Sequence, residues 1–321
     1  MDVFFFEAFL EEADMIKRYL PSGIKAGFTD KTIQEYKGVP ISAKVSSIRT
    51  QSVIEPIWSE KTNGILTRSS GFDHIQRYLK KFPKIVPAGY LPLYCSRAVA
   101  EQALMLWMAL LRKLPSQLKS FCNFNRDNLT GRECKGKTLL VVGVGNIGYE
   151  IADVGTGLGM NVLDVDIVKK HADINYVEID EGISKSDVIV CSMNLTDDNA
   201  AYFNYERLKK AKKNTIFVNI ARGELSPSRD IAALLKDGFL GGVGMDVYNN
   251  ECELAVSLRS GKSSQDSEVK ATLDLLKHPN TLLTPHNAFN TYESVTRKAE
   301  QSCRQISQFL DNGTFLWPIP V

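Results

Sequence analysis

Thr138-Leu-Leu-Val-Val-Gly-Val-Gly-Asn-Ile-Gly148 is the stretch that decides the fold of this chain of 321 residues. An apolar run enters a turn that carries Gly143, Gly145 and Gly148, and a helix-like segment follows. In a dinucleotide site the first glycine makes a tight turn and the second lets the backbone approach a pyrophosphate. The third glycine lets the helix pack closely on its strand, with the phosphates at the helix N-terminus. The stretch therefore predicts a nucleotide-binding domain.

A second apolar run follows that helix and ends in an acid, Asp166. Asp166 lies about twenty residues beyond the last glycine, where a carboxylate accepts hydrogen bonds from the adenosine ribose. A carboxylate would repel a ribose 2′-phosphate, so the sequence favours NAD over NADP. An ordinary acid at the end of a strand is the alternative for Asp166.

Composition indicates a globular chain of two domains, with 44% hydrophobic and 24% charged residues. A formal net charge of +2 with scattered Lys and Arg residues gives no reason to expect nucleic acid. No apolar run is long enough for a transmembrane helix, and the N-terminus lacks the features of a signal peptide. The six cysteines are far apart and suggest neither disulfides nor a metal site, which favours a reducing cytoplasm.

Strand-sized apolar runs alternate with helical stretches along the whole chain. Before the glycine turn they stand at residues 2–6, 23–28, 42–48 and 64–67, and they predict a small parallel α/β domain. Residues 83–96 hold three prolines and are interpreted as a linker, and a long helix is expected from Arg97 to Leu114.

From Thr138 onward the same alternation predicts a doubly wound parallel sheet. Its strands are expected at residues 138–142, 161–165, 187–191, 215–219, 241–246 and 281–284. Gly155 and Gly157 are expected to allow close packing of the first helix. Residues 249–270 are interpreted as an exposed loop or insertion, and the last helix, about Glu293 to Leu310, is predicted to return to the first domain.

His286 is the best candidate among the four histidines for a general acid or base. It follows an apolar strand and Pro285, and ligands in open α/β sheets bind outside the carboxyl ends of the strands. Histidine ordinarily titrates near neutrality, which suits proton exchange. A loop histidine bonded to backbone is the alternative. His74 and His278 are expected at helix ends, and His171 on an exposed charged segment.

Arg222 stands at the end of another predicted strand, in Asn219-Ile-Ala-Arg-Gly223. A guanidinium there can hold a carboxylate with two hydrogen bonds and stays charged at any working pH. An arginine in a surface turn is the alternative. Asp246 and Glu251 follow a third strand, and a carboxylate that reaches His286 would fix its ring and favour its charged form. The pattern leaves open which carboxylate does so.

Five motifs in order resemble the D-2-hydroxyacid dehydrogenases. They are Leu66-Thr-Arg-Ser-Ser-Gly-Phe-Asp-His-Ile75, Gly143-Val-Gly-Asn-Ile-Gly148, Asn219-Ile-Ala-Arg-Gly223, Gly244-Met-Asp-Val-Tyr248 with Glu251, and Thr284-Pro-His286. The resemblance implies a smaller, flavodoxin-like α/β substrate domain built from residues 1–95 and 290–321. A doubly wound NAD-binding domain, residues 96–289, would be inserted in it. Family members are usually homodimers, so a homodimer through the nucleotide-binding domains is expected.

The same resemblance implies roles for individual residues. Arg222 would bind the substrate's carboxylate and carbonyl, His286 would exchange the proton, and Glu251 would pair with His286. Backbone groups of Ser70 and Gly71 would hold the carboxylate, with Tyr94 and Phe289 lining the pocket. Beyond Asp166 and the glycines, the expected NAD contacts are Asn146, Ile147, Met193, Asn194, Asn199, Ile220, Ala221 and, at the nicotinamide amide, Asp246.

Within the family the chain most resembles the D-lactate dehydrogenase branch, because of its insertion after Glu251 and the segment Pro285-His-Asn-Ala-Phe-Asn-Thr291. The expected reaction is reduction of pyruvate to D-lactate by NADH, and Phe289 would suit a methyl side chain. Other keto acids (glyoxylate, hydroxypyruvate or a bulkier one) are the alternative within the family. An NAD-sensing interaction protein similar to the C-terminal-binding-protein corepressors is the alternative outside enzymes.

Overall fold

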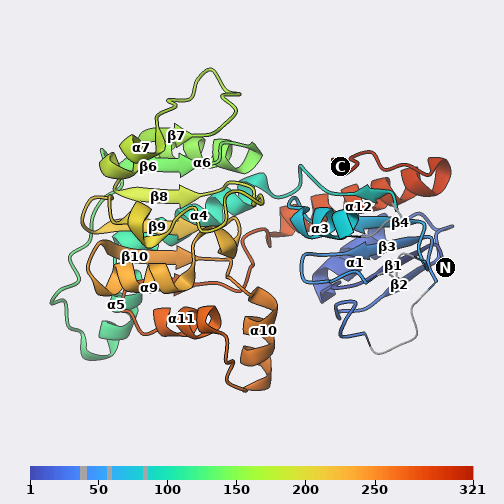
Figure 1. Ribbon diagram of the computed structural model, residues 1–321, viewed down its shortest axis with the longest axis horizontal. Helices are drawn as coiled ribbons and strands as arrows, with labels where there is room; N and C mark the ends of the chain where they lie inside the picture. Colours follow the sequence, from blue (N-terminus) through green and yellow to red (C-terminus); the bar gives the residue numbers. More distant parts are fainter. Residues whose placement is uncertain (37–41, 56–59, 82–85, 321) are drawn as a thin grey trace. The chain divides into compact units, whose positions relative to one another are not determined.

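The computed structural model describes residues 1–36, 42–55, 60–81 and 86–320, and the chain divides into two compact units (Figure 1). Unit 1 comprises Met1–Cys95 and Asn290–Val321, and unit 2 comprises Ser96–Phe289. Each unit is a parallel α/β fold with its own sheet and core, so the predicted fold class is confirmed. Among the described residues, no helix is long and apolar enough to cross a membrane.

Unit 1 is built on a parallel sheet with the strand order β2-β1-β3-β4-β5. The strands are β1 (Val3–Phe5), β2 (Ala26–Phe28), β3 (Val45–Ile48), β4 (Gly64–Thr67) and β5 (Ala88–Gly89). This is the flavodoxin-like order, which reverses direction between β1 and β3 and places a ligand crevice outside the carboxyl ends of those strands.

The helices of unit 1 come from both ends of the chain. Among the described residues of unit 1 they are α1 (Leu10–Tyr19), α3 (Asp73–Lys81) and α12 (Tyr292–Asn312), and α12 packs against α1. The hydroxyl of Thr291 accepts a hydrogen bond from the N–H of Ser294 at the start of α12, and Gly313 ends the helix with φ 73°. The predicted last helix is confirmed, with bounds within two residues.

Part of the predicted linker is a strand. Within residues 83–96, β5 pairs in parallel with β4, so the prediction is wrong for Ala88 and Gly89. Residues 83–85 of that prediction lie outside the described part of the chain. Two small residues close to prolines carry no hydrophobic periodicity, so the sequence pattern could not reveal this edge strand.

Unit 2 is built on a second parallel sheet with the order β11-β10-β9-β8-β6-β7. Its strands are β6 (Thr138–Val142), β7 (Asn161–Val165), β8 (Val188–Cys191), β9 (Thr215–Asn219), β10 (Leu240–Met245) and β11 (Thr281–Leu283). An isolated parallel bridge between Asp164 and Tyr176 extends the sheet beyond β7. The chain changes direction between β6 and β8, which is the position of ligand crevices in doubly wound folds. All six predicted strands are confirmed.

Helices cover both faces of this sheet, as Figure 1 shows. They are α4 (Ser96–Leu111), α5 (Leu114–Ser120), α6 (Asn146–Gly157), α7 (Ile179–Lys185), α8 (Tyr205–Leu208), α9 (Ser228–Lys236), α10 (Glu251–Ser260) and α11 (Ser267–Leu275), with the 3-10 turns η1 (Phe121–Asn123) and η2 (Gly223–Leu225). The long helix expected to reach Leu114 ends at Leu111. Lys113 has φ 52°, so the chain turns there and begins α5.

Two further predictions about unit 2 are wrong. Residues 249–270 are not a loop, because α10 and the start of α11 occupy most of them. The sequence of α10 lacks a clear apolar stripe, and only two of its residues are buried, so the sequence pattern did not indicate a helix. Gly157 has open space around it, whereas Gly155 does pack closely on Leu139.

Candidate functional site

The three glycines of the turn between β6 and α6 have different surroundings. Gly143 has φ 94°, and a Cβ atom there would overlap the backbone of Met193 after β8. A Cβ atom on Gly148 would overlap the carbonyl oxygen of Gly143. Gly145 is exposed, and nothing lies where its Cβ atom would be. The turn therefore leaves an open space at the N-terminus of α6, where N–H groups without helical acceptors can bind phosphate.

Asp166 is joined to this turn by hydrogen bonds. Its Oδ2 atom accepts from the N–H of Val144 at 2.6 Å, and its Oδ1 atom accepts from the N–H of Val168 at 2.9 Å. These bonds hold the carboxylate at the carboxyl end of β7, next to the glycine turn. Together, the open turn and the oriented carboxylate fit a dinucleotide with a free ribose 2′-hydroxyl.

The segment after β8 is ordered by side-chain bonds to the backbone. Asn199 accepts from the N–H of Thr196 at 2.8 Å and donates to the carbonyl of Asn194 at 2.8 Å. Ser192 donates to the carbonyl of Gly143 at 2.7 Å. The predicted NAD contacts Met193, Asn194 and Asn199 thus lie in one segment beside the glycine turn, and their contacts with NAD stay predictions.

Arg222 lies in a turn that Asn219 organises. The side-chain amide of Asn219, at the end of β9, donates to the carbonyl of Arg222 at 2.9 Å and accepts from the N–H of Ala221 at 2.9 Å. Gly223 is needed after Arg222, because a Cβ atom there would overlap the backbone of Tyr248. The guanidinium is half-buried and donates to the carbonyl of Ala221 at 2.8 Å. Ile220 and Ala221, two more predicted NAD contacts, lie in the same turn.

His286 and Glu251 are hydrogen-bonded to each other at the same edge of the sheet. The Nδ1 atom of His286 lies 2.8 Å and 2.9 Å from the two carboxylate oxygens of Glu251. Glu251 begins α10 after Asn250, which has φ 53°, and His286 itself has φ 50°. Positive φ values in residues other than glycine store backbone strain, and such residues cluster at functional sites. With Nδ1 held by Glu251, proton exchange with a substrate would use Nε2.

Asp246 holds the loop that carries His286. Its carboxylate is fully buried and accepts hydrogen bonds from the hydroxyl of Thr284 at 2.5 Å and from the N–H groups of Asn287 and Ala288 at 2.9 Å and 2.8 Å. Burial raises the pKa of Asp246, although these hydrogen bonds oppose the rise. The predicted contact between Asp246 and nicotinamide stays a prediction, since the described contacts of the carboxylate are all within the loop.

The residues predicted for the substrate carboxylate lie at the carboxyl edge of unit 1. Ser70 and Gly71 follow β4 and are half-buried, and the hydroxyl of Ser70 donates to the carbonyl of Leu91 at 3.1 Å. The Ser70 hydroxyl also lies 3.3 Å from the sulfur of Cys95, next to the buried Tyr94. The structure therefore places Ser70 and the Tyr94–Cys95 segment side by side.

Comparison with known proteins gives the family. The sequence model of the D-isomer specific 2-hydroxyacid dehydrogenase, NAD binding domain, matches residues 104–288. The chain belongs to this family. It is 32% identical over 265 residues to 2-hydroxyacid dehydrogenase A of Aspergillus oryzae, covering 80% of this chain and 75% of that protein. It is 30% identical over 294 residues to a D-lactate dehydrogenase of Escherichia coli, covering 89% and 87%.

The solved structures agree with this assignment. A D-lactate dehydrogenase from Aquifex aeolicus, whose crystal structure contains NAD and lactic acid, superimposes with a TM-score of 0.86 at 26% identity. The match covers 98% of this chain and 99% of that chain. The predictions of an NAD-dependent 2-hydroxyacid dehydrogenase and of NAD as its cofactor are confirmed.

Sequence reasoning missed the residues of this dehydrogenase that hold the reactive side chains. Asn219 fixes the Arg222 turn, Thr284 joins Asp246 to the His286 loop, and Tyr248 donates to the carbonyls of Met245 and Thr284 at 2.9 Å and 2.7 Å. Asn219, Thr284 and Tyr248 are part of the family motifs, and their place in these motifs could have indicated their role. His171 is also corrected: it is half-buried and stacks on Tyr149, with ring centroids 4.3 Å apart.

Proposed function

We propose that this dehydrogenase reduces a 2-keto acid to the D-2-hydroxy acid with NADH. The observation that carries the proposal is the hydrogen bond between His286 and Glu251, which stands at the same sheet edge as the glycine turn and Arg222. NADH, when bound, supplies the hydride that C2 of the substrate receives. Arg222 binds the carboxylate and polarises the carbonyl, and His286 gives the proton to the developing alkoxide. Glu251 keeps the imidazole ring oriented.

Pyruvate is the first substrate to test. The D-lactate dehydrogenases among the relatives support it, and so does the buried aromatic ring of Phe289, which would leave room for a small side chain. Ser70 and Gly71 are proposed as further donors to the substrate carboxylate, and Tyr94 as part of the pocket wall. This rests on the family motif after β4.

The test is an assay of NADH oxidation over a panel of keto acids, repeated with NADPH. The proposal expects turnover with at least one short keto acid and formation of the D-hydroxy acid, identified by chiral chromatography. Tight NADH binding without turnover of any keto acid would contradict the enzyme proposal and favour the NAD-sensing interaction protein. A product of L configuration would contradict the proposed stereochemistry.

Replacing Asp166 is expected to change which nucleotide is used. In Asp166→Ser the carboxylate that binds the ribose hydroxyls and repels a 2′-phosphate is gone, so the ratio of kcat/KM for NADH over NADPH should fall at least about tenfold. Steady-state kinetics with both nucleotides measure it. Asp180→Asn, which changes an exposed acid paired with Lys210, is the control and should keep the ratio. An unchanged ratio in Asp166→Ser would refute the role of Asp166.

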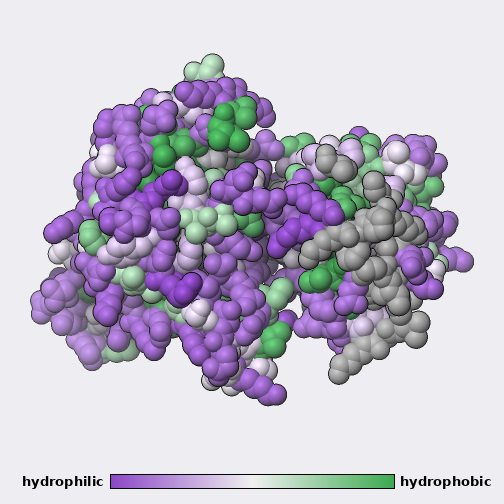
Figure 2. Space-filling model, in the orientation of Figure 1, coloured by the Kyte–Doolittle hydropathy of each residue, from purple (hydrophilic) through white to green (hydrophobic). Residues whose placement is uncertain are grey.

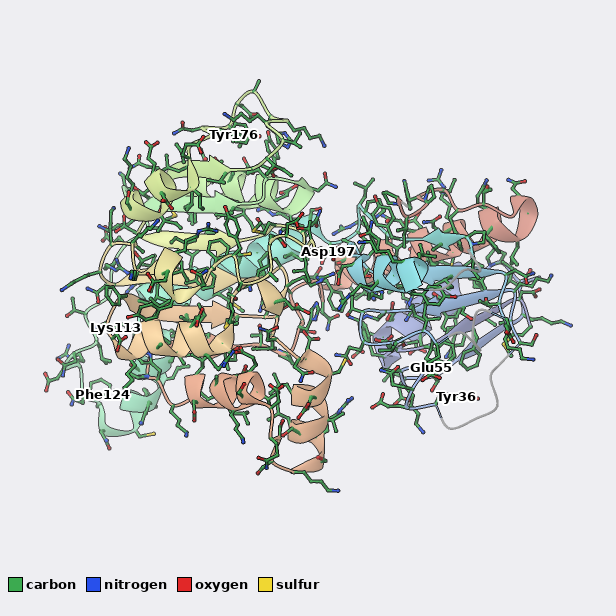
Figure 3. The ribbon with its side chains drawn as sticks, viewed as in Figure 1. Tyr36, Glu55, Lys113, Phe124, Tyr176 and Asp197 are labelled. Atoms are coloured by element: carbon green, nitrogen blue, oxygen red, sulfur yellow. The ribbon has the colours of Figure 1, made fainter. Side chains whose placement is uncertain are left out.

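We also propose that two copies associate through α5 and η1 of unit 2. The face shown in Figure 2 is mostly hydrophilic. In the short segment of α5, η1 and the next residue, Leu118, Phe121 and Phe124 are 67%, 75% and 80% exposed. Figure 3 labels Phe124 after α5. Clustered exposed apolar residues mark interaction surfaces. Sedimentation equilibrium should give a dimer for the native chain and a monomer for the double variant Phe121→Ser/Phe124→Ser. Leu10→Ser is the control and should stay a dimer, because it removes an exposed leucine outside the α5–η1 segment. A native monomer would contradict the proposal.

A further inference from the structure

The loop after β4 in unit 1 presents two neighbouring N–H groups to a ligand. In the part of the chain that the structure describes, the N–H groups of Ser70 and Gly71 donate to no other residue. Both residues are half-buried at the carboxyl edge of the sheet, where α/β folds bind ligands. Successive N–H groups of this kind can bind an anion, provided that their directions are fixed.

Hydrogen bonds hold the peptide planes on both sides of these N–H groups. The N–H of Leu91 donates to the carbonyl of Ser69 at 3.1 Å, and the hydroxyl of Ser69 donates to the carbonyl of Gly71 at 2.7 Å. Because the C=O and N–H groups of a trans peptide point in opposite directions, the first bond directs the N–H of Ser70 away from Leu91. The next peptide, which carries the N–H of Gly71, is thus held at both ends.

The hydroxyl of Ser69 is itself held by a chain of hydrogen bonds that starts at His74. The Oγ atom of Ser69 lies 2.7 Å from Oγ1 of Thr67, which lies 3.0 Å from Nε2 of His74. A serine hydroxyl has one proton, which goes to the carbonyl of Gly71, so Thr67 donates to Ser69. Since Thr67 then has no proton left, its oxygen accepts from Nε2–H of His74. The chain therefore runs in one direction, from His74 to Gly71.

The local fold brings these side chains together in unit 1. Side chains alternate along an extended chain, so Thr67 and Ser69 lie on one face, while Arg68 points to the other and donates to Glu12 at 2.9 Å. His74 lies in the first turn of α3. Thr67 is 0% exposed and Ser69 is 7% exposed, so bulk water does not replace a lost partner of either hydroxyl. Removal of the first donor therefore disturbs the whole chain.

We propose that His74 is a positioning residue for the substrate carboxylate. Through Thr67 and Ser69 it holds the Gly71 carbonyl, so that the N–H groups of Ser70 and Gly71 point at one carboxylate. This rests on the proposed 2-keto acid reduction, in which these N–H groups bind the substrate. His74 does not touch the substrate and exchanges no proton with it. Its effect is on the binding of every 2-keto acid, because all of them share the carboxylate.

Two matched pairs of variants test this inference. Thr67→Val removes the hydroxyl with little change of shape, whereas Thr67→Ser keeps it. His74→Phe removes the Nε2 donor, whereas His74→Gln keeps an N–H donor of similar reach. We expect KM for the keto acid to rise at least about fivefold in Thr67→Val and His74→Phe and to stay within about twofold of the native value in Thr67→Ser and His74→Gln. Arg77→Gln, which changes an exposed residue of α3, is the control.

The kinetic pattern separates positioning from a merely structural role. Positioning changes KM for the keto acid and leaves kcat and KM for NADH within about twofold of the native values. Lost stability instead reduces the amount of active enzyme, which lowers kcat and leaves both KM values unchanged. Turnover with an unchanged KM for the keto acid in Thr67→Val and His74→Phe would overturn the positioning role and keep the reductase.

The histidine ring gives a spectroscopic readout that does not depend on turnover. In 15N–1H NMR spectra, the His74 signal is the one that is missing in His74→Gln. Its proton should be on Nε2 and protected from exchange with water in the native chain, and this protection should be lost in Thr67→Val. A proton on Nδ1 alone, or an unprotected Nε2 proton in the native chain, would overturn the hydrogen-bond chain.

Binding of oxamate, in which a carboxylate is joined to a carbonyl, tests the carboxylate site directly. Calorimetric titration of the NADH-loaded protein should give affinities at least about fivefold lower for Thr67→Val and His74→Phe than for Thr67→Ser and His74→Gln. This result without reduction of any keto acid would support the positioning role and contradict the reductase. Equal affinities in all variants, or no binding by the native chain, would overturn the inference. Unchanged melting temperatures confirm that the variants fold.

Discussion

Replacing His286 with alanine is expected to lower kcat at least about 100-fold while NADH binding is retained. General acid catalysis typically contributes 10²–10⁴-fold, and the alanine variant has no group to protonate the alkoxide that forms at C2. The described hydrogen bonds of His286 are to Glu251 and to the carbonyl of Thr284, neither of which belongs to the glycine turn, so the nucleotide site should stay intact. Single-turnover kinetics measure the chemical step, and fluorescence titration measures the affinity for NADH.

Two further variants are needed to interpret the result for His286→Ala. His278→Gln changes a histidine whose Nδ1 atom accepts from the N–H of Asn280 in a turn after α11, and it should keep full activity. Glu251→Gln keeps a hydrogen-bonding partner for His286 without the charge, and its loss of kcat should lie between the other two. Near-normal turnover in His286→Ala would exclude His286 as the acid.

Most of the fold could be predicted because most strands, unlike β5, can be recognised from the local sequence alone. The bounds of β6, β7 and β9 match the predicted runs 138–142, 161–165 and 215–219 residue for residue. Strands β6 and β9 are largely buried, and buried parallel strands are nearly continuous apolar runs. α10 could not be predicted in this way, because few of its residues are buried and the surrounding stretch is polar. Helices of this kind depend on contacts that sequence periodicity does not reveal.

The placement of the candidate site residues could also be predicted in part. Strands that are neighbours in the sheet bring their carboxyl ends together, so Arg222, Glu251 and His286 could be placed at one edge from the strand pattern and the family motifs. The pattern left open whether Asp246 or Glu251 reaches His286. The structure pairs His286 with Glu251 because Asn250, in a left-handed conformation, starts α10 at that point, while Asp246 bonds the loop backbone. The hydrophobic periodicity of a sequence does not reveal such backbone geometry.

The buried cluster of Arg68, Glu12 and Lys298 was beyond prediction, since Arg68 follows β4 whereas Glu12 and Lys298 lie on α1 and α12, far apart in the sequence. Arg68→Met is expected to lower the free energy of unfolding by about 3–5 kcal/mol, as removal of one partner of a buried ion pair commonly does. Arg68 also donates to the hydroxyl of Ser47 at 3.0 Å and to the carbonyl of Phe6 at 2.7 Å, and both acceptors would lose this donor. Chemical denaturation at pH 7 measures the change, and a loss below about 1 kcal/mol would contradict it.

Lys298→Met is the matched comparison, and pH separates the two variants. Because the pKa of Lys298 is lowered to about 7 in the folded protein and is about 10.4 in an unfolded chain, the unfolded chain holds the extra proton between these values. The contribution of Lys298 to stability therefore rises as pH increases from 7 to 10. Denaturation at pH 7 and pH 9 should show the native chain gaining stability relative to Lys298→Met as pH rises. For Arg68→Met the difference should change less with pH, because Lys298 still titrates in that variant, although its pKa is lowered less without the charge of Arg68. A level difference for Lys298→Met would mean that the buried lysine stays protonated and that Glu12 outweighs burial and the charge of Arg49.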